Sequence, residues 1–308
     1  MRAIRYLIVF ILLVGATATA ALYLAPEPVT HAVIDLDRAF SGLERKQVRL
    51  DDGTNYVYLE GGAGEPLLLL HGFGADKDNF TRVARHLTPH YRVIIPDHVG
   101  FGESSHPPEA DYSPQGQSTH LRALMQKLGV TELHLGGNSM GGHIAITYAA
   151  QFPAEVKSLW LLDAGGVWSA PGNDFAQQVR ASGHNPLMAR TEDEFALMFE
   201  YAMADPPFVP RPILDVKARE RIRNFDLEQI IFAQVSTDAV EERAATVTAP
   251  TLIVWGREDR PLNYAAGELL DRIMVNSQLI IMDGVGHMPM LERPAQAAAD
   301  YLQFRSSF

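Results

Sequence analysis

The 308-residue sequence contains no cysteine. This absence excludes disulfide bonds, catalysis by a thiol and lipid attachment to a cysteine near the N-terminus. A core of this size buries roughly three quarters of the surface that the unfolded chain exposes, so stability requires no disulfide, metal ion or partner. The length is compatible with one large α/β domain or with two ordinary domains.

Basic side chains are outnumbered by acidic ones. The 26 Lys and Arg residues stand against 37 Asp and Glu residues, which gives a formal net charge of −11, and they form no basic stripe. We therefore expect no nucleic-acid partner. No His-x-x-x-His motif or carboxylate cluster has the spacing of a metal site, so we predict no metal and no cofactor. Repeats and low-complexity segments are also absent.

A long apolar run lies at the N-terminus. Arg2 and Arg5 precede residues 6–24, which carry no charge. The run is close to the ~20 residues of a membrane-spanning helix, and the two arginines favour an N-terminus on the cytoplasmic side of the membrane. We predict a membrane anchor over residues 1–25; the alternative is a signal peptide cleaved near Ala18–Ala20. In both cases the globular part lies on the non-cytoplasmic side, either anchored or released as a secreted or periplasmic protein.

Beyond the first residues, short apolar runs alternate with helical stretches, and this order predicts an α/β fold. Residues 45–50 and 56–60 flank a turn and suggest an edge hairpin. Continuous Leu, Ile and Val runs are typical of buried parallel strands, so we expect a mostly parallel, doubly wound sheet. The runs are 67–70, 93–95, 133–135, 159–162, 252–255 and 279–282.

One long interval lacks a strand pattern. Between the runs at 159–162 and 252–255, helical stretches are expected around residues 191–204, 211–224 and 227–235. We interpret residues 167–247 as an inserted helical cap, whose bulky apolar side chains would line an acyl pocket. The other boundaries predicted are a linker at 26–44 and a core domain formed by 45–166 and 248–308.

A serine follows the run at 133–135. Residues 137–141 read Gly-Asn-Ser-Met-Gly and precede a helical stretch rich in small residues. A serine on a sharp strand-to-helix turn is the nucleophile elbow, in which flanking glycines let strand and helix pass closely. This context makes Ser139 the candidate nucleophile.

A nucleophilic serine requires a base, and the base requires an orienting acid. Asp259 follows the run at 252–255, and His287 follows the run at 279–282. Both therefore lie past the carboxyl ends of strands, where α/β sheets place their chemistry. The order Ser139, Asp259, His287 is typical of α/β-hydrolases and differs from that of chymotrypsin and subtilisin. Asp163, directly after the run at 159–162, is the rival acid.

The oxyanion hole is expected from two backbone N–H groups. The run at 67–70 ends in His71-Gly72-Phe73-Gly74, and this loop supplies one donor, assigned to Phe73. Met140 follows the nucleophile and supplies the other donor. His71 is expected to hold the loop by hydrogen bonding, without a catalytic role.

With these motifs in place, the chain resembles the bacterial family V lipases and the membrane-anchored monoacylglycerol lipases of the α/β-hydrolase superfamily. The resemblance extends from about residue 45 onward, including the cap, and implies the same triad, oxyanion loop and ester hydrolysis. In the acid loop it favours Asp259, while its neighbour Glu258 points elsewhere. The segments that carry the resemblance are 65–74, 76–80, 95–105, 136–142, 156–161 and 285–290.

The sequence therefore predicts a serine carboxyl-ester hydrolase, a lipase or esterase acting on acylglycerols or similar lipidic esters. A carbon–carbon hydrolase of the meta-cleavage type is the alternative, because such enzymes carry the same Gly-Asn-Ser-Met-Gly-Gly elbow. Export or anchoring argues against it, since those enzymes act on cytosolic intermediates. A non-catalytic binding module of the same fold would be expected to lose triad members, and none is missing here.

Overall fold

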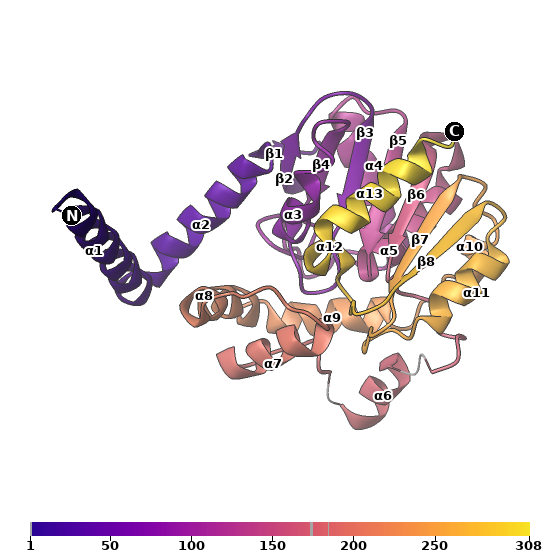
Figure 1. The fold of residues 1–308 in the computed structure, drawn as a ribbon. Helices are drawn as coiled ribbons and strands as arrows, with labels where there is room; N and C mark the ends of the chain where they lie inside the picture. Colours follow the sequence, from indigo (N-terminus) through magenta and orange to yellow (C-terminus); the bar gives the residue numbers. More distant parts are fainter. Residues whose placement is uncertain (1, 173–174, 184) are drawn as a thin grey trace.

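A single eight-stranded sheet forms the centre of the computed structural model, which describes residues 2–172, 175–183 and 185–308 (Figure 1). The strand order is β1-β2-β4-β3-β5-β6-β7-β8. The strands are β1 Leu43–Arg49, β2 Asn55–Gly61, β3 Pro66–Leu70, β4 Arg92–Pro96, β5 Leu133–Asn138, β6 Val156–Leu162, β7 Thr251–Gly256 and β8 Ser277–Met282.

The sheet is antiparallel only at one edge. Strand β2 pairs antiparallel with β1 and with β4, whereas every pairing from β4 through β8 is parallel. The predicted edge hairpin and the predicted mostly parallel sheet are thus confirmed. The carboxyl ends of parallel strands all lie at the same end of the sheet. At that end, residue 71 directly follows β3, residue 139 follows β5, residue 163 follows β6 and residue 257 follows β7.

Both faces of the sheet are covered. Along β3, Leu68 and Leu70 pack in one apolar cluster, whereas Leu67 and Leu69 pack in the other, as the alternation of a strand requires. Helices α4 Pro114–Lys127, α5 Met140–Gln151, α10 Glu241–Ala244 and α11 Ala265–Ile273 supply the first cluster. Helices α3 Thr81–Ala84, α12 Pro289–Glu292 and α13 Pro294–Arg305 supply the second, and two short 3-10 turns occupy Lys77–Phe80 and Pro153–Glu155.

Further helices are inserted between β6 and β7, and Figure 1 shows α6 to α9 together below the sheet. The helices expected around 191–204, 211–224 and 227–235 are confirmed as α7 Glu192–Ala202, α8 Arg211–Ile222 and α9 Phe225–Val235. Helix α6 Phe175–Ser182 and helix α10 were not expected. Of the expected cap, residues 173–174 and 184 lie outside the described residues.

Two helices precede the sheet and extend to one side of it (Figure 1). Helix α1 Arg2–Leu24 contains a stretch, Ile4–Leu24, that is long and apolar enough to cross a membrane, with a mean hydropathy of 2.4 and none of its window buried. Helix α2 Pro26–Phe40 occupies the segment expected as a linker. Helix α8 contacts both, so the N-terminal helices lie against the inserted ones.

Candidate active site

Ser139 sits at the turn between β5 and α5 with φ 55° and ψ −119°. A left-handed backbone is costly for a residue with a side chain and persists only where the surroundings enforce it. Here the backbone N–H of Ser139 donates to Leu162 O at 3.0 Å, and its carbonyl accepts from Gly165 N at 2.8 Å. The end of strand β6 and the loop that follows it therefore hold the strained serine in place.

The glycines around Ser139 are required by close approach. A Cβ at Gly141 would lie 2.1 Å from Leu70 O, and one at Gly137 would lie 2.3 Å from Gly141 O. Helix α5 thus begins directly against the ends of β3 and β5, as expected for a nucleophile elbow.

His287 and Asp259 form a buried pair. The imidazole Nδ1 lies 2.7 Å from Asp259 Oδ2, and the side chains are only 6% and 0% exposed. Since Nδ1–H donates to the carboxylate, Nε2 remains available to accept a proton. Burial lowers the pKa of His287, which favours the neutral imidazole that a general base requires. Asn138 Nδ2 donates to His287 O at 2.9 Å, so the elbow and the histidine loop are joined directly.

The two other acids named from the sequence have distinct places. Glu258 accepts from Val285 N at 3.0 Å and so faces the backbone of the histidine loop, as the resemblance implied. Asp163, the rival acid, is fully buried and lies in the same cluster: Asp163, Asp259 and His287 each offer an atom, and these three atoms lie within 4.8 Å of one another. The structure therefore brings both candidate acids to the histidine.

The expected oxyanion donors lie beside the serine. Met140 is the first residue of α5, and the first N–H groups of a helix have no acceptor within it. Phe73 and Met140 line a small cavity together with Ser139, and a Cβ at Gly72 would lie 3.1 Å from Ser139 Cβ. The preceding His71 is buried, and both of its ring nitrogens contact backbone groups of the loops: Nε2 accepts from His98 N at 3.0 Å, and Nδ1 contacts Gly72 O at 2.8 Å.

One residue of the site was missed in the sequence. Glu292 of α12 is buried, and its carboxylate accepts from the backbone N–H of Gly286 at 3.0 Å and of Ala204 at 2.9 Å. It also accepts from Met288 at 3.2 Å and from Asp205 at 2.9 Å. This carboxylate therefore holds the histidine loop against the end of α7. The only sequence signal was one acid directly after the apolar stretch Pro289-Met290-Leu291.

A cavity of about 810 Å³ contains Ser139 and His287 in its lining. Apolar side chains of α7 and α8 form part of the wall, namely Phe195, Met198, Phe199 and Leu214. Helix α2 forms another part through His31, Ile34, Asp35 and Arg38. The segment expected as a linker is therefore a wall of the site.

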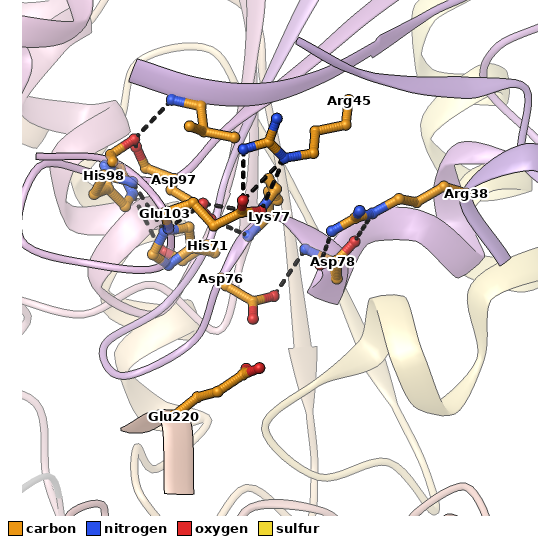
Figure 2. Close-up of polar contacts among 12 residues, drawn as sticks. Arg38, Arg45, His71, Asp76, Lys77, Asp78, Asp97, His98, Glu103 and Glu220 are labelled. Carbon is orange, nitrogen blue, oxygen red and sulfur yellow. Dashed lines mark hydrogen bonds and ion pairs between the residues drawn. The ribbon is translucent and has the colours of Figure 1, made fainter. Parts of the chain in front are cut away.

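The loop after Phe73 is embedded in a network of charges, drawn in Figure 2. Buried Asp97 accepts from Lys77 Nζ at 2.9 Å and from Glu103 N at 2.8 Å. Lys77 Nζ also donates to Glu103 at 2.8 Å, and the neighbouring acids raise the pKa of Lys77 despite its burial. Arg45 and Lys77 together hold the pKa of Glu103 at about 2, against the effect of burial. These groups are paired ions that fix the loop.

Two further contacts extend this network. Arg38 of α2 pairs with Asp78, and Lys217 of α8 donates to Asp76 Oδ2 at 2.8 Å. Asp76 in turn accepts from Asp78 N at 2.9 Å. The loop that begins with the expected oxyanion residue Phe73 is thus joined to helix α2 through Asp78 and to the inserted helix α8 through Asp76.

Comparison with known proteins identifies the family of the chain. A family model described as the alpha/beta hydrolase fold matches residues 65–294. Lipase 1 of Psychrobacter immobilis is 45% identical over 283 residues, which cover 90% of this chain and 89% of that protein. Monoacylglycerol lipase ABHD6 of Mus musculus is 28% identical over 278 residues, covering 85% of this chain and 83% of that protein.

Solved structures show the same fold. The crystal structure of a membrane phospholipase A, a bacterial virulence factor, has a TM-score of 0.89 and 35% identity, covering 100% of this chain and 99% of that one. A meta-cleavage product hydrolase from Pseudomonas fluorescens IP01 has a TM-score of 0.73 at 23% identity, covering 85% of this chain and 97% of that one. At that identity the likeness extends to the fold alone. The chain belongs to the α/β-hydrolase fold family, and it is a carboxylic ester hydrolase of the lipase and esterase class.

Proposed function

We propose that the protein hydrolyses acylglycerols or similar lipidic esters through a Ser139-His287-Asp259 triad. The observation that carries this proposal is the buried pair of His287 and Asp259, because His287 lines one cavity together with the strained Ser139 and apolar side chains of α7 and α8. A cavity of about 810 Å³ falls within the range of ligand pockets, and apolar walls suit an acyl chain.

In the first half-reaction Ser139 Oγ attacks the ester carbonyl while His287 Nε2 accepts its proton. The backbone N–H groups of Phe73 and Met140 stabilise the oxyanion of the tetrahedral intermediate. Asp259 keeps the imidazole in the Nδ1–H tautomer and stabilises the imidazolium. His287 then returns the proton to the departing alcohol, and the acyl group remains on Ser139. In the second half-reaction water attacks the acyl-enzyme by the same route, which releases the fatty acid and restores the serine.

We also propose a division of the chain. Residues 45–166 and 248–308 would form the hydrolase core, and residues 167–247 would form the cap over the site. Residues 1–25 would anchor the protein in a membrane, or act as a cleaved signal, with the catalytic domain on the non-cytoplasmic side. The support is the apolar stretch Ile4–Leu24 behind a basic N-terminus. A site close to the membrane suits a lipidic substrate.

A hydrolysis panel tests the substrate class. It would contain p-nitrophenyl esters of increasing chain length, mono- and triacylglycerols, and one meta-cleavage dienoate. We expect ester and acylglycerol hydrolysis that is absent in Ser139→Ala, together with loss of labelling by an organophosphonate in that variant. Turnover of the dienoate without ester hydrolysis would overturn the proposal in favour of carbon–carbon cleavage, and labelling at another serine would overturn the nucleophile.

A further inference from the structure

Asp163 has a positive backbone φ, as residues of active sites often do, although the mechanism above does not use it. In the part of the chain that the structure describes, only two non-glycine residues have positive φ: Ser139 at 55° and Asp163 at 46°. Such residues cluster at active sites, where the surroundings hold them in place. Asp163 directly follows β6, and its N–H donates to Val254 O of β7 at 3.0 Å.

The carboxyl of Asp163 is buried and half satisfied. Its Oδ1 accepts from Gly256 N at 2.8 Å, whereas Oδ2 has no hydrogen-bond partner among the described residues. The nearby Asp259 accepts from Leu262 N at 2.8 Å and from His287 Nδ1 at 2.7 Å. Two carboxyls therefore share one buried cluster with a single histidine, and the donors are unequally distributed between them.

Two ionised carboxylates cannot both be accommodated at such a place without strong repulsion, so one of them retains a proton. Burial, followed by the charge of Asp259, raises the pKa of Asp163 well above its ordinary range. Burial also raises the pKa of Asp259, but the hydrogen bond from Leu262 N–H opposes this effect. Among the described residues, the other titratable groups that act on the pair are His287, Glu292 of α12 and Tyr201 of α7, and Arg260 acts on Tyr201 in turn.

We propose that Asp163 is a neutral carboxylic acid whose Oδ2–H donates to Asp259, so that it fixes the carboxylate that orients His287. Asp163 is then a positioning residue, and it acts on the imidazole only through Asp259. The inference rests on the proposed function, because it takes Asp259 as the orienting acid. It also accounts for the presence of both candidate acids at one histidine: one carries the charge and the other carries a proton.

Two substitutions separate the proton from the backbone geometry. Asp163→Asn keeps a donor and a neutral side chain, and asparagine tolerates positive φ. Asp163→Gly removes the side chain, and glycine adopts this backbone without strain. We expect Asp163→Asn to retain most of the wild-type kcat, whereas Asp163→Gly should lose kcat by about 10- to 100-fold with little change in KM, because the imidazole is misaligned.

The pH profile provides a readout that a purely structural role would not move. We expect the acidic limb of kcat/KM to be unchanged in Asp163→Asn, since no charge is lost. If Asp163 were ionised in the wild type, its replacement would remove a negative charge near His287, lower the pKa of the imidazole and move the limb to lower pH. That shift would overturn the proposal, as would wild-type kcat in Asp163→Gly.

An infrared difference spectrum between the wild type and Asp163→Asn at neutral pH observes the proton directly. We expect the carbonyl stretch of a protonated carboxyl in the wild type only, and absence of this band overturns the proposal. If Asp163→Asn abolishes activity while Asp259→Asn is mild, Asp163 is itself the orienting acid, which overturns both this inference and the assigned triad. Absence of ester hydrolysis by the wild-type protein would instead refute the proposed function alone.

Discussion

Arg38 and Asp78 form a two-point ion pair in which Arg38 Nε and Nη2 each lie 2.7 Å from a carboxylate oxygen of Asp78. Their side chains are 11% and 16% exposed, so the pair is shielded from water. Parallel hydrogen bonds of this kind fix orientation as well as distance. Because Asp78 follows the oxyanion loop by a few residues, helix α2 and that loop are held as one unit.

We expect Arg38→Ala to lower the free energy of unfolding by about 2–4 kcal/mol, between the values for exposed and fully buried pairs. We also expect a lower kcat, because Asp78 would release the loop that carries Phe73. Thermal unfolding and ester kinetics measure the two effects. Arg49→Ala is the matched control, since Arg49 is exposed and forms no ion pair among the described residues. Equal behaviour of the two variants would show that α2 does not support the site.

The proposed triad predicts a pattern of losses and a direction for the pH dependence. His287→Ala should be nearly as damaging as Ser139→Ala, whereas Asp259→Asn should cost somewhat less, since the members act as a unit.

Protonated His287 cannot accept the serine proton, so activity should fall as the pH drops through the pKa of His287. Burial lowers this pKa. We therefore expect the acidic limb of kcat/KM below pH ~6.5, the ordinary value for histidine, and a limb above it would contradict the role of burial.

Most of the sheet was predictable because a buried parallel strand needs apolar side chains on both faces. The run at 67–70 was predicted as such a strand, and β3 occupies Pro66–Leu70. Helix α2 was not predicted, because Pro26 and Pro28 lie at its start and favour both a helix N-terminus and a linker. Its place is determined by Arg38, whose partner lies 40 residues further along the chain.

The site divides in the same way. Ser139, Asp259 and His287 could be named because each follows a recognisable strand in a known order. Local sequence could not reveal that Asp163 and Asp259 are neighbours, since their contact depends on the parallel pairing of β6 with β7. Glu292 was missed for a related reason. Its partners are backbone N–H groups of the histidine loop and of the end of α7, and nearly every residue type has such a group, so the sequence does not identify the contact.

The apolar wall formed by α7 should govern chain-length preference. Phe199 lines the cavity, whereas Leu197 on the same helix is 65% exposed and does not. A charge at position 199 would be placed against the acyl chain, so Phe199→Asp should reduce kcat/KM for long-chain esters about tenfold more than for acetate esters. Leu197→Asp is the matched control and should affect both classes equally. Equal losses across chain lengths in Phe199→Asp would assign Phe199 to the packing of the inserted helices.

Successive N-terminal deletions should separate the apolar helix from the wall of the site. Removal of residues 1–25 takes away the stretch Ile4–Leu24 and leaves α2, so we expect a soluble enzyme with wild-type kcat toward a short-chain ester. Removal of residues 1–40 also takes away His31, Ile34 and Arg38 from the cavity lining, and kcat should then fall together with the unfolding temperature. Fractionation and intact mass of the full-length product distinguish an anchored chain from a cleaved one. Recovery of the untruncated protein from the cytosolic fraction would refute both forms of export, and full activity without residues 1–40 would refute the role of α2 as part of the site.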